Sequence, residues 1–368
     1  MQRIPARIGD ARRDIETPAL VADLDVLERN LDAMAEATRE IRLRPHAKSH
    51  KCSTIAKMQI ARGAIGICCQ KTDEAAAFVD AGIGDVLVTN EIVASRKIER
   101  LAELARRARI GVLIDDERVV PVLSQAATRA GATIDVYVEL DVGAHRCGVS
   151  AEHAGVLARA AHAAPGLRFR GLQAYHGAAQ HLRDPGERER AIDAAASLAR
   201  RTRARIVASG VACDIVSGAG TGTWRFERDS RVYDELQPGS YVFMDADYAR
   251  NLAAPDDLRF GQSLFVLASV MSVACRGQAV VDAGLKAFAF DSGLPQVHAL
   301  SGVEYVKASD EHGVLRIAED ARSLALGDRV LLAPGHCDPT VNLYDYLVGV
   351  RRGIVEAVWP IEARGALG

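Results

Sequence analysis

Residues 109–141, RIGVLIDDERVVPVLSQAATRAGATIDVYVELD, contain the pattern that defines the architecture of this chain. The apolar run Gly111–Ile114 is followed by Glu117–Ala130, in which apolar residues recur at helical spacing with polar residues between them. A second apolar run, Val136–Leu140, comes after that stretch. Short and nearly continuous apolar runs are typical of strands buried on both faces of a parallel sheet. The stretch therefore predicts a strand, a helix and a second strand.

The same alternation of strands and helices extends over the first two thirds of the chain. The predicted helices are Leu24–Ile41, Lys51–Arg62, Asp73–Ala81, Ser95–Ala108, Glu117–Ala130, Ala151–Ala163 and Glu187–Arg205. The predicted strands are Leu43–Ala47, Gly66–Cys69, Val86–Val88, Gly111–Ile114, Val136–Leu140, Gly171–Tyr175, Ile215–Ser217 and Tyr241–Met244. Strands in this number, most of them followed by a helix, match the (β/α)8 barrel of the TIM type. A doubly wound parallel sheet is the alternative, because the alternation alone does not decide whether the sheet closes.

The pattern changes near Phe260, where helical spacing fades and β-rich runs follow one another. These runs are Ser263–Ala274, Gln278–Asp282, Ala287–Phe290, Val314–Ile317, Arg329–Ala333, Tyr346–Arg351 and Gly353–Val358. Turn signals such as Ser292-Gly293 and Pro334-Gly335 separate them. The last third of the chain is therefore predicted to form a mainly antiparallel β domain.

The length of the chain agrees with an α/β protein of two domains. Its 368 residues correspond to about two domains of usual size. We assign the barrel to residues 23–258 and the β domain to residues 259–368. A strand at Pro18–Ala22, within residues 1–22, is expected to join the β domain.

Charge and cysteine content exclude several classes of protein. The chain carries 46 basic and 48 acidic side chains, and this balance argues against a nucleic-acid-binding surface. Seven cysteines, an odd number in a long chain, indicate a reducing compartment and not a disulfide framework. Residues 1–16 lack the apolar core of a signal peptide, and no apolar run reaches the roughly 18 residues of a membrane span. We therefore expect a cytoplasmic protein with no nucleic-acid or membrane partner.

Polar residues stand at the C-terminal ends of most predicted strands, where barrel enzymes carry their chemistry. Lys48, in Arg44-Pro-His-Ala-Lys-Ser-His-Lys51, follows the first strand. A partly buried lysine has a lowered pKa, and its neutral amine can attack a carbonyl carbon. A lysine exposed in a solvated loop is the alternative. His176 ends the sixth predicted strand and Asp245 ends the eighth.

A glycine-rich run, Ser217-Gly-Ala-Gly-Thr-Gly-Thr223, follows the seventh predicted strand. Such a run can direct several backbone N–H groups at an anion, and barrels often bind phosphate after strands seven and eight. The run is not a Walker A loop, because no Gly-Lys-Ser/Thr follows it. It also fails the dinucleotide fingerprint, because Thr223 occupies the third glycine position. The glycine-rich run is compatible with a phosphate site and with a flexible turn.

The predicted β domain contains a possible metal-binding pair in Pro334-Gly-His-Cys-Asp-Pro-Thr340. If this segment is extended, His336 and Asp338 point to one face and Cys337 points away. Imidazole and carboxylate together suit Mn, Mg, Co or Zn, and two protein ligands leave positions for water or substrate. A polar turn between strands is the alternative.

Further motifs stand along almost the whole chain. They are Thr17-Pro-Ala-Leu20, Gln70-Lys-Thr-Asp-Glu74, Glu139-Leu-Asp-Val-Gly143, Arg146-Cys-Gly148, Ala174-Tyr-His-Gly177 and Pro238-Gly-Ser-Tyr241. With the lysine, glycine-rich and histidine segments above, the chain resembles the group of D-threonine aldolases, 3-hydroxy-D-aspartate aldolases and D-serine dehydratases. This group belongs to the alanine-racemase-like (fold type III) pyridoxal-phosphate enzymes.

The resemblance implies a role for each matching residue. Lys48 matches the lysine that binds pyridoxal phosphate covalently, and Arg146 matches the arginine that hydrogen-bonds the phenolic oxygen of the cofactor. The matches to the phosphate cradle and the cofactor lining are Gly220, Thr221, Gly222, Gln70, Tyr175 and Tyr241. His336 and Asp338 match the metal ligands; aspartate resembles the aldolase branch, because the dehydratases usually have His-x-Cys. His145 stands where a small residue is expected, and it either reaches toward substrate or faces solvent.

By this resemblance, the function is cleavage of a D-3-hydroxy amino acid, D-threonine or 3-hydroxy-D-aspartate, to glycine and an aldehyde. The cofactors would be pyridoxal phosphate and a divalent metal, with Mn, Mg or Co preferred to Zn. His176 is the predicted general base, because an imidazole titrates close to neutral pH. The resemblance also implies a homodimer.

Four other functions remain to be weighed. A metal-dependent D-serine or 3-hydroxyaspartate dehydratase would use the same cofactors. A racemase is disfavoured because its reaction has no leaving hydroxyl for a metal to engage. A non-catalytic pyridoxal-phosphate-binding protein would not need the β domain. A hydrolase that uses only a metal would leave Lys48 without a role.

Overall fold

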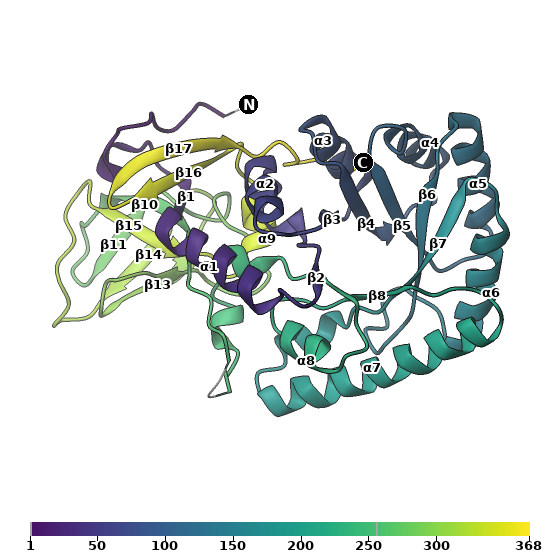
Figure 1. The fold of residues 1–368 in the computed structure, drawn as a ribbon. Helices are drawn as coiled ribbons and strands as arrows, with labels where there is room; N and C mark the ends of the chain where they lie inside the picture. The colour runs from purple at the N-terminus through teal and green to yellow at the C-terminus, as the bar shows by residue number, and fades with distance from the viewer. Residues whose placement is uncertain (1, 255–256) are drawn as a thin grey trace.

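The computed structural model describes residues 2–254 and 257–368. They form two sheets that lie side by side (Figure 1). One is an eight-stranded parallel sheet with helices around it, and the other is a nine-stranded sheet built mainly of antiparallel pairs. This is the predicted fold class, a barrel with a second β domain.

The first sheet closes on itself. Its strands are β2 (Arg42–Leu43), β3 (Ile67–Cys69), β4 (Asp85–Glu91), β5 (Arg109–Ile114), β6 (Ile134–Glu139), β7 (Leu167–Gln173), β8 (Ile215–Gly218) and β9 (Glu235–Leu236). They pair in the order β2-β9-β8-β7-β6-β5-β4-β3. The two ends meet, because Ile65 N donates to Leu43 O at 2.9 Å and Cys68 N donates to Pro45 O at 2.8 Å. The barrel prediction is confirmed, and the doubly wound alternative is wrong.

Helices follow most barrel strands, and local sequence signals set their ends. They are α1 (Leu24–Ala37), α2 (Ser53–Ala61), α3 (Thr72–Asp80), α4 (Ser95–Leu104), α5 (Val119–Ala130), α6 (Ala151–Ala163), α7 (Pro185–Ala208) and α8 (Trp224–Asp229). The side chain of Asp184 accepts a hydrogen bond from Glu187 N and caps α7, which begins at Pro185. α5 ends at Gly131, whose φ of 63° suits glycine. Among the described residues, the helices are all too short or too polar to cross a membrane.

The second sheet combines the first strand of the chain with its last third. Its strands are β1 (Ala19–Asp23), β10 (Leu264–Ser272), β11 (Gln278–Val281), β12 (Gln296–Val297), β13 (Val303–Ala308), β14 (Gly313–Ile317), β15 (Arg329–Ala333), β16 (Tyr346–Arg351) and β17 (Ile354–Pro360). β1 lies between β10, to which it is antiparallel, and β16, to which it is parallel. The chain then passes directly into α1, whose first turn is capped by the carboxylate of Asp23.

The eighth barrel strand differs from the prediction. Tyr241–Met244 is not a strand; the 3₁₀ helix η4 (Ser240–Val242) begins there, and the eighth strand is β9. Glu235, in β9, is fully buried and lies 3.0 Å from Nε of Arg44. Because β9 is short and begins with a carboxylate, it has no apolar run, whereas Tyr241–Met244 is apolar because it packs in the core.

Three details of the β domain also differ from the prediction. Ala287–Phe290 is not a strand, and strands β12 and β13 were not predicted. His336–Asp338 is not extended throughout, because α9 (Cys337–Val341) begins at Cys337. The prediction that an extended backbone places both metal-ligand candidates on one face is therefore wrong.

Candidate active site

A cavity lies at the C-terminal ends of the barrel strands. Six of the eight residues predicted to bind the cofactor line it: Lys48, Gln70, Arg146, Tyr175, Gly220 and Thr221. Gly222 follows immediately in the chain but does not line it. The ring of Tyr241 is buried elsewhere in the core, where its hydroxyl accepts a hydrogen bond from Nε2 of Gln59 at 3.0 Å. Most of the predicted cofactor residues are thus brought together.

Lys48 lies in the 3₁₀ turn η2 (Ala47–Ser49). Three residues separate this turn from the first barrel strand, β2. The backbone N–H of Lys48 donates to Nδ1 of His46, and its Nζ lies 3.0 Å from Oδ2 of Asp338 in α9. The charge of Asp338 raises the pKa of the Lys48 amine above its ordinary value, against the effect of burial. The expected lowering of this pKa is therefore wrong for this arrangement. The contact shows that the amine of Lys48 and the carboxylate of Asp338, a candidate metal ligand, lie side by side.

A buried hydrogen-bond network fixes Gln70 at the cavity wall. Its Nε2 lies 3.0 Å from Nε2 of His46 and 3.0 Å from Oγ1 of Thr89. Burial lowers the pKa of His46 well below its usual range, so the ring is neutral. His46 belongs to the lysine motif, and its contacts with Lys48 and Gln70 give it a structural role that the sequence pattern does not show.

The glycine-rich run forms a close-fitting turn after β8. A Cβ atom on Gly220 would lie 2.4 Å from Oε1 of Gln180, and one on Gly222 would lie 2.5 Å from its backbone oxygen. The backbone N–H groups of Gly220 and Thr221 have no acceptor among the described residues. Both residues line the cavity. Free N–H groups in a glycine-rich turn suit an anion, so the phosphate of the expected cofactor fits here.

Arg146 lies over the ring of Tyr175, with its guanidinium carbon 6.0 Å from the ring centroid. Its NH2 is 3.9 Å from the carboxyl group of Glu139. Burial, together with a hydrogen bond that the protonated group donates to Glu91, raises the pKa of Glu139 above its ordinary value. Glu139 is therefore protonated near neutral pH and leaves the charge of Arg146 available to an anionic group in the cavity.

The donor atoms of His336 and Asp338 suit a divalent cation. Nδ1 of His336 lies 2.6 Å from Oδ2 of Asp291, so its Nε2 is the nitrogen left for a metal. Metal-binding histidines are commonly oriented by a carboxylate in this way. Burial alone would raise the pKa of Asp338, but the charges of Lys48 and His336 lower it well below its usual range. An ionised carboxylate and an oriented imidazole form a suitable donor pair.

His176, the predicted base, lies beside the loop that follows β6 and does not line the cavity with Lys48. A Cβ on Gly143 would be 2.9 Å from its Nε2, and its buried Nδ1 has no partner among the described residues. Burial lowers its pKa. His145 is largely exposed and its Nδ1 lies 2.9 Å from Oδ2 of Asp141, so it faces solvent.

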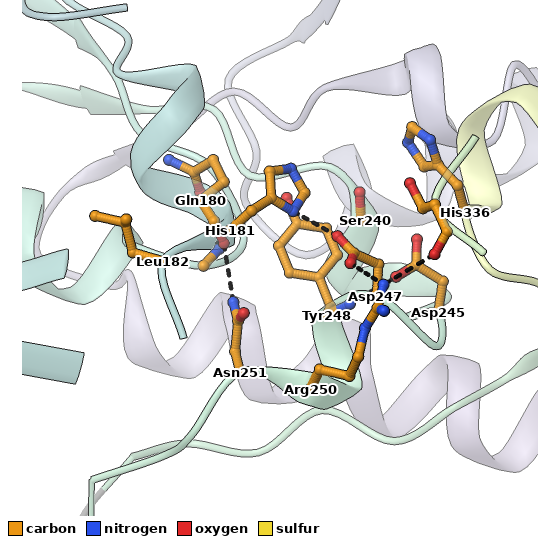
Figure 2. Close-up of polar contacts among 12 residues, drawn as sticks. Gln180, His181, Leu182, Ser240, Asp245, Asp247, Tyr248, Arg250, Asn251 and His336 are labelled. Atoms are coloured by element: carbon orange, nitrogen blue, oxygen red, sulfur yellow. Dashed lines mark hydrogen bonds and ion pairs between the residues drawn. The ribbon is translucent and has the colours of Figure 1, made fainter. Parts of the chain in front are cut away.

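A second imidazole, His181, was not identified from the sequence. It ends the 3₁₀ helix η3 (Gly177–His181), and its Nδ1 lies 2.5 Å from Oδ2 of Asp247. Its ring packs against Tyr248 (Figure 2). The two ring centroids are 5.4 Å apart. Tyr248 lines the cavity that contains Lys48.

Residues 22–247 match the family "Alanine racemase, N-terminal domain". The chain belongs to the alanine racemase N-terminal domain family. Residues 263–350 of this family member match a second model, "Putative serine dehydratase domain". The two matches fall on the barrel and on the second sheet.

Similar proteins agree with this membership. The chain is 47% identical to a 3-hydroxy-D-aspartate aldolase of Paracoccus denitrificans, covering 98% of this chain and 95% of the relative. It is 48% identical to a D-threonine aldolase of an Arthrobacter species, covering 98% and 96%. A crystal structure of D-threonine aldolase from Filomicrobium marinum superimposes with a TM-score of 0.97, at 50% identity over 99% of this chain and all of that one. The predicted resemblance is confirmed: the chain is a lyase of the D-threonine aldolase type.

Proposed function

We propose that the chain is a pyridoxal-phosphate- and divalent-metal-dependent aldolase, which cleaves D-threonine or 3-hydroxy-D-aspartate to glycine and an aldehyde. The observation that supports it is the meeting of three features at one cavity. Lys48 lies there, the free N–H groups of Gly220 and Thr221 line it, and Asp338 reaches Lys48 from the second sheet's domain. The aldolase relatives support the same reaction.

The chain's own residues would hold the cofactor in a defined orientation. Lys48 would bind it covalently, the turn at Gly220 and Thr221 would bind its phosphate, and Arg146 would hydrogen-bond its phenolic oxygen. When bound, pyridoxal phosphate supplies an electron sink for the negative charge that develops at Cα of the substrate. Tyr175, which lines the cavity under Arg146, would keep the ring in place.

His336 and Asp338 would hold the metal ion. A divalent ion at this position would lower the pKa of a hydroxyl group that binds it, which favours its deprotonation. We expect Mn, Mg or Co rather than Zn. Asp291 would keep Nε2 of His336 directed to the ion through its contact with Nδ1.

The proton of the β-hydroxyl group needs an acceptor, and the structure offers two imidazoles. His176 was the expected base, but its buried Nδ1 has no partner among the described residues, and neither imidazole is itself part of the cavity wall. His181 is held by Asp247 and packs on Tyr248, which lines the cavity. We therefore propose Nε2 of His181 as the acceptor. His181→Ala should lower kcat by about 10²–10⁴-fold, and His176→Ala should have a much smaller effect; the reverse order would restore His176 as the base.

One observation favours a second function. The C-terminal domain matches a family described as a serine dehydratase domain, so loss of the β-hydroxyl group is the alternative reaction. Asp338, where the dehydratases of the resembling group have cysteine, favours the aldolase.

The products distinguish the two reactions. The purified protein with pyridoxal phosphate and Mn²⁺ is given D-threonine, 3-hydroxy-D-aspartate and D-serine in parallel. An aldehyde and an equal amount of glycine are expected from at least one of the first two substrates. Ammonia and a 2-oxo acid, without glycine, would overturn the proposal in favour of the dehydratase.

The remaining expectations stay proposals. We propose a homodimer, which light scattering of the eluted protein would test by mass. Placement in the cytoplasm, and the absence of nucleic-acid and membrane partners, are likewise expectations from composition.

A further inference from the structure

Asp247 is a largely buried carboxylate at the centre of a polar cluster beside the cavity (Figure 2). Its two oxygens have different partners. Oδ2 lies 2.5 Å from Nδ1 of His181. Oδ1 accepts a hydrogen bond from NH2 of Arg183 at 2.6 Å and another from NH2 of Arg250. One oxygen thus contacts the imidazole, and the other accepts hydrogen bonds from two guanidinium groups.

The surrounding contacts keep this carboxylate in place. NH1 of Arg183 donates to the backbone oxygen of Asp247 at 2.8 Å and to Oδ1 of Asn251 at 2.7 Å. Nδ2 of Asn251 donates to the backbone oxygen of Gln180 at 2.9 Å, next to His181. The backbone N–H of Asp247 donates to Gly335, which precedes the metal-ligand candidate in the chain. The loop that carries His181 is therefore tied to the segment that carries Asp247.

The charge state of Asp247 determines which nitrogen of His181 carries a proton. Burial alone would raise the pKa of Asp247, but the hydrogen bond from Arg183 and the charges of His181 and Arg183 lower it below the ordinary value. An ionised carboxylate can only accept hydrogen bonds. Nδ1 of His181 must then be the donor, so a neutral His181 ring has its lone pair at Nε2.

We propose that Asp247 is a positioning residue for His181: it fixes the ring and reserves Nε2 as the proton acceptor. This inference rests on the proposed function, in which His181 takes the proton of the β-hydroxyl group. Asp247 itself would touch neither substrate nor cofactor. Arg183 and Arg250 would contribute by holding its other oxygen.

The substitution Asp247→Asn tests this idea with little change in shape. Two guanidinium groups require an acceptor at the position of Oδ1. The amide oxygen would therefore face Arg183 and Arg250, and the amide NH2 would face His181. Nδ1 would then have to accept a hydrogen bond, and the neutral ring would carry its proton at Nε2. In this tautomer His181 cannot accept the substrate's proton.

The experiment measures kinetics in a double-mutant cycle with the holoenzyme. Asp247→Asn should lower kcat by about 10²–10⁴-fold and change KM by less than about threefold. In the His181→Ala background, the same change should lower kcat by less than about threefold, because the two residues act as one unit. Asp135→Asn is the matched control: Asp135 is also buried and paired with arginines, Arg109 and Arg168, at the opposite end of the barrel. Its kcat should stay within about twofold of the wild type.

A readout that needs no activity separates this proposal from the proposed function. Long-range ¹H–¹⁵N spectra of histidine-labelled protein should show His181 protonated at Nδ1 in the wild type and at Nε2 in Asp247→Asn. His181→Ala identifies the signal. An unchanged tautomer in Asp247→Asn, or losses of kcat that multiply in the double variant, would overturn the positioning role. If the wild type makes no aldehyde but the tautomers differ as expected, the proposed function fails and the orientation of His181 by Asp247 stands.

Discussion

Replacing Glu227 with glutamine should remove a loss of stability that the wild type suffers as the pH rises. Glu227 lies on α8 and is fully buried behind the glycine-rich turn. Its Oε1 accepts a hydrogen bond from Oγ1 of Thr223 at 2.7 Å, whereas its buried Oε2 has no partner among the described residues. Burial raises the pKa of Glu227 to about 8, although the hydrogen bond from Thr223 lowers it. The folded protein therefore holds this proton far more tightly than the unfolded chain does.

The sign and the size of the effect follow from this difference. The ordinary pKa of the group is 4.5, so between pH 4.5 and about 8 the folded state binds a proton that the unfolded state has lost. The contribution of Glu227 to stability is complete below pH 4.5 and declines as the pH rises through about 8. The slope is about 1.4 kcal/mol per pH unit, and the loss by pH 8 is on the order of 4 kcal/mol. Glutamine keeps the shape and stays neutral.

Urea unfolding at several pH values between 5.5 and 8 would measure this contribution. Subtracting the free energy of unfolding of the wild type from that of Glu227→Gln isolates the one group, because other titrating groups cancel when they are distant. The difference should grow with pH by about 1 kcal/mol or more per unit in favour of the variant. A difference that stays constant over this range would refute the reasoning, because it would mean that Glu227 is already ionised in the folded protein.

Three more outcomes are expected. Lys48→Ala should lack the visible absorbance of protein-bound pyridoxal phosphate after incubation with the cofactor, and an unchanged spectrum would exclude Lys48 as the covalent partner. Chelation should stop aldehyde production and added Mn²⁺ should restore it, whereas full activity after exhaustive chelation would exclude a metal role. Arg44→Leu should lower the free energy of unfolding in urea by about 3–5 kcal/mol, because it leaves the buried carboxylate of Glu235 without its cation; a loss below about 1 kcal/mol would contradict this.

The barrel could be predicted because its signal is local. Runs such as Val136–Leu140 are apolar over their whole length, and the intervening helices show regular spacing. The eighth strand escaped prediction because the partners of the buried Glu235, Arg44 and Ser217, are distant from it in the sequence. A pattern of hydrophobicity cannot show that a charge has a partner.

The same distinction applies to the candidate site. Lys48 and the glycine-rich turn stand at strand ends, so the topology of a barrel is enough to bring them together. His181 and Asp247 lie in irregular segments, and their contact depends on how these loops pack. His336 and Asp338 were chosen for their chemistry, but the extended backbone assumed for them is absent because α9 begins at Cys337.

The position of β1 affects how the protein folds during synthesis and whether its second domain can be exchanged. Its partners β10 and β16 both belong to the last third of the chain, so the strand stays unpaired until synthesis has passed β10. Pairings this far apart in sequence form slowly and leave apolar surface exposed meanwhile. A fragment that contains only residues 259–368 would lack an interior strand of its own sheet. The second domain therefore cannot be transplanted as one continuous segment, and exchanges between relatives would have to carry Ala19–Asp23 with it.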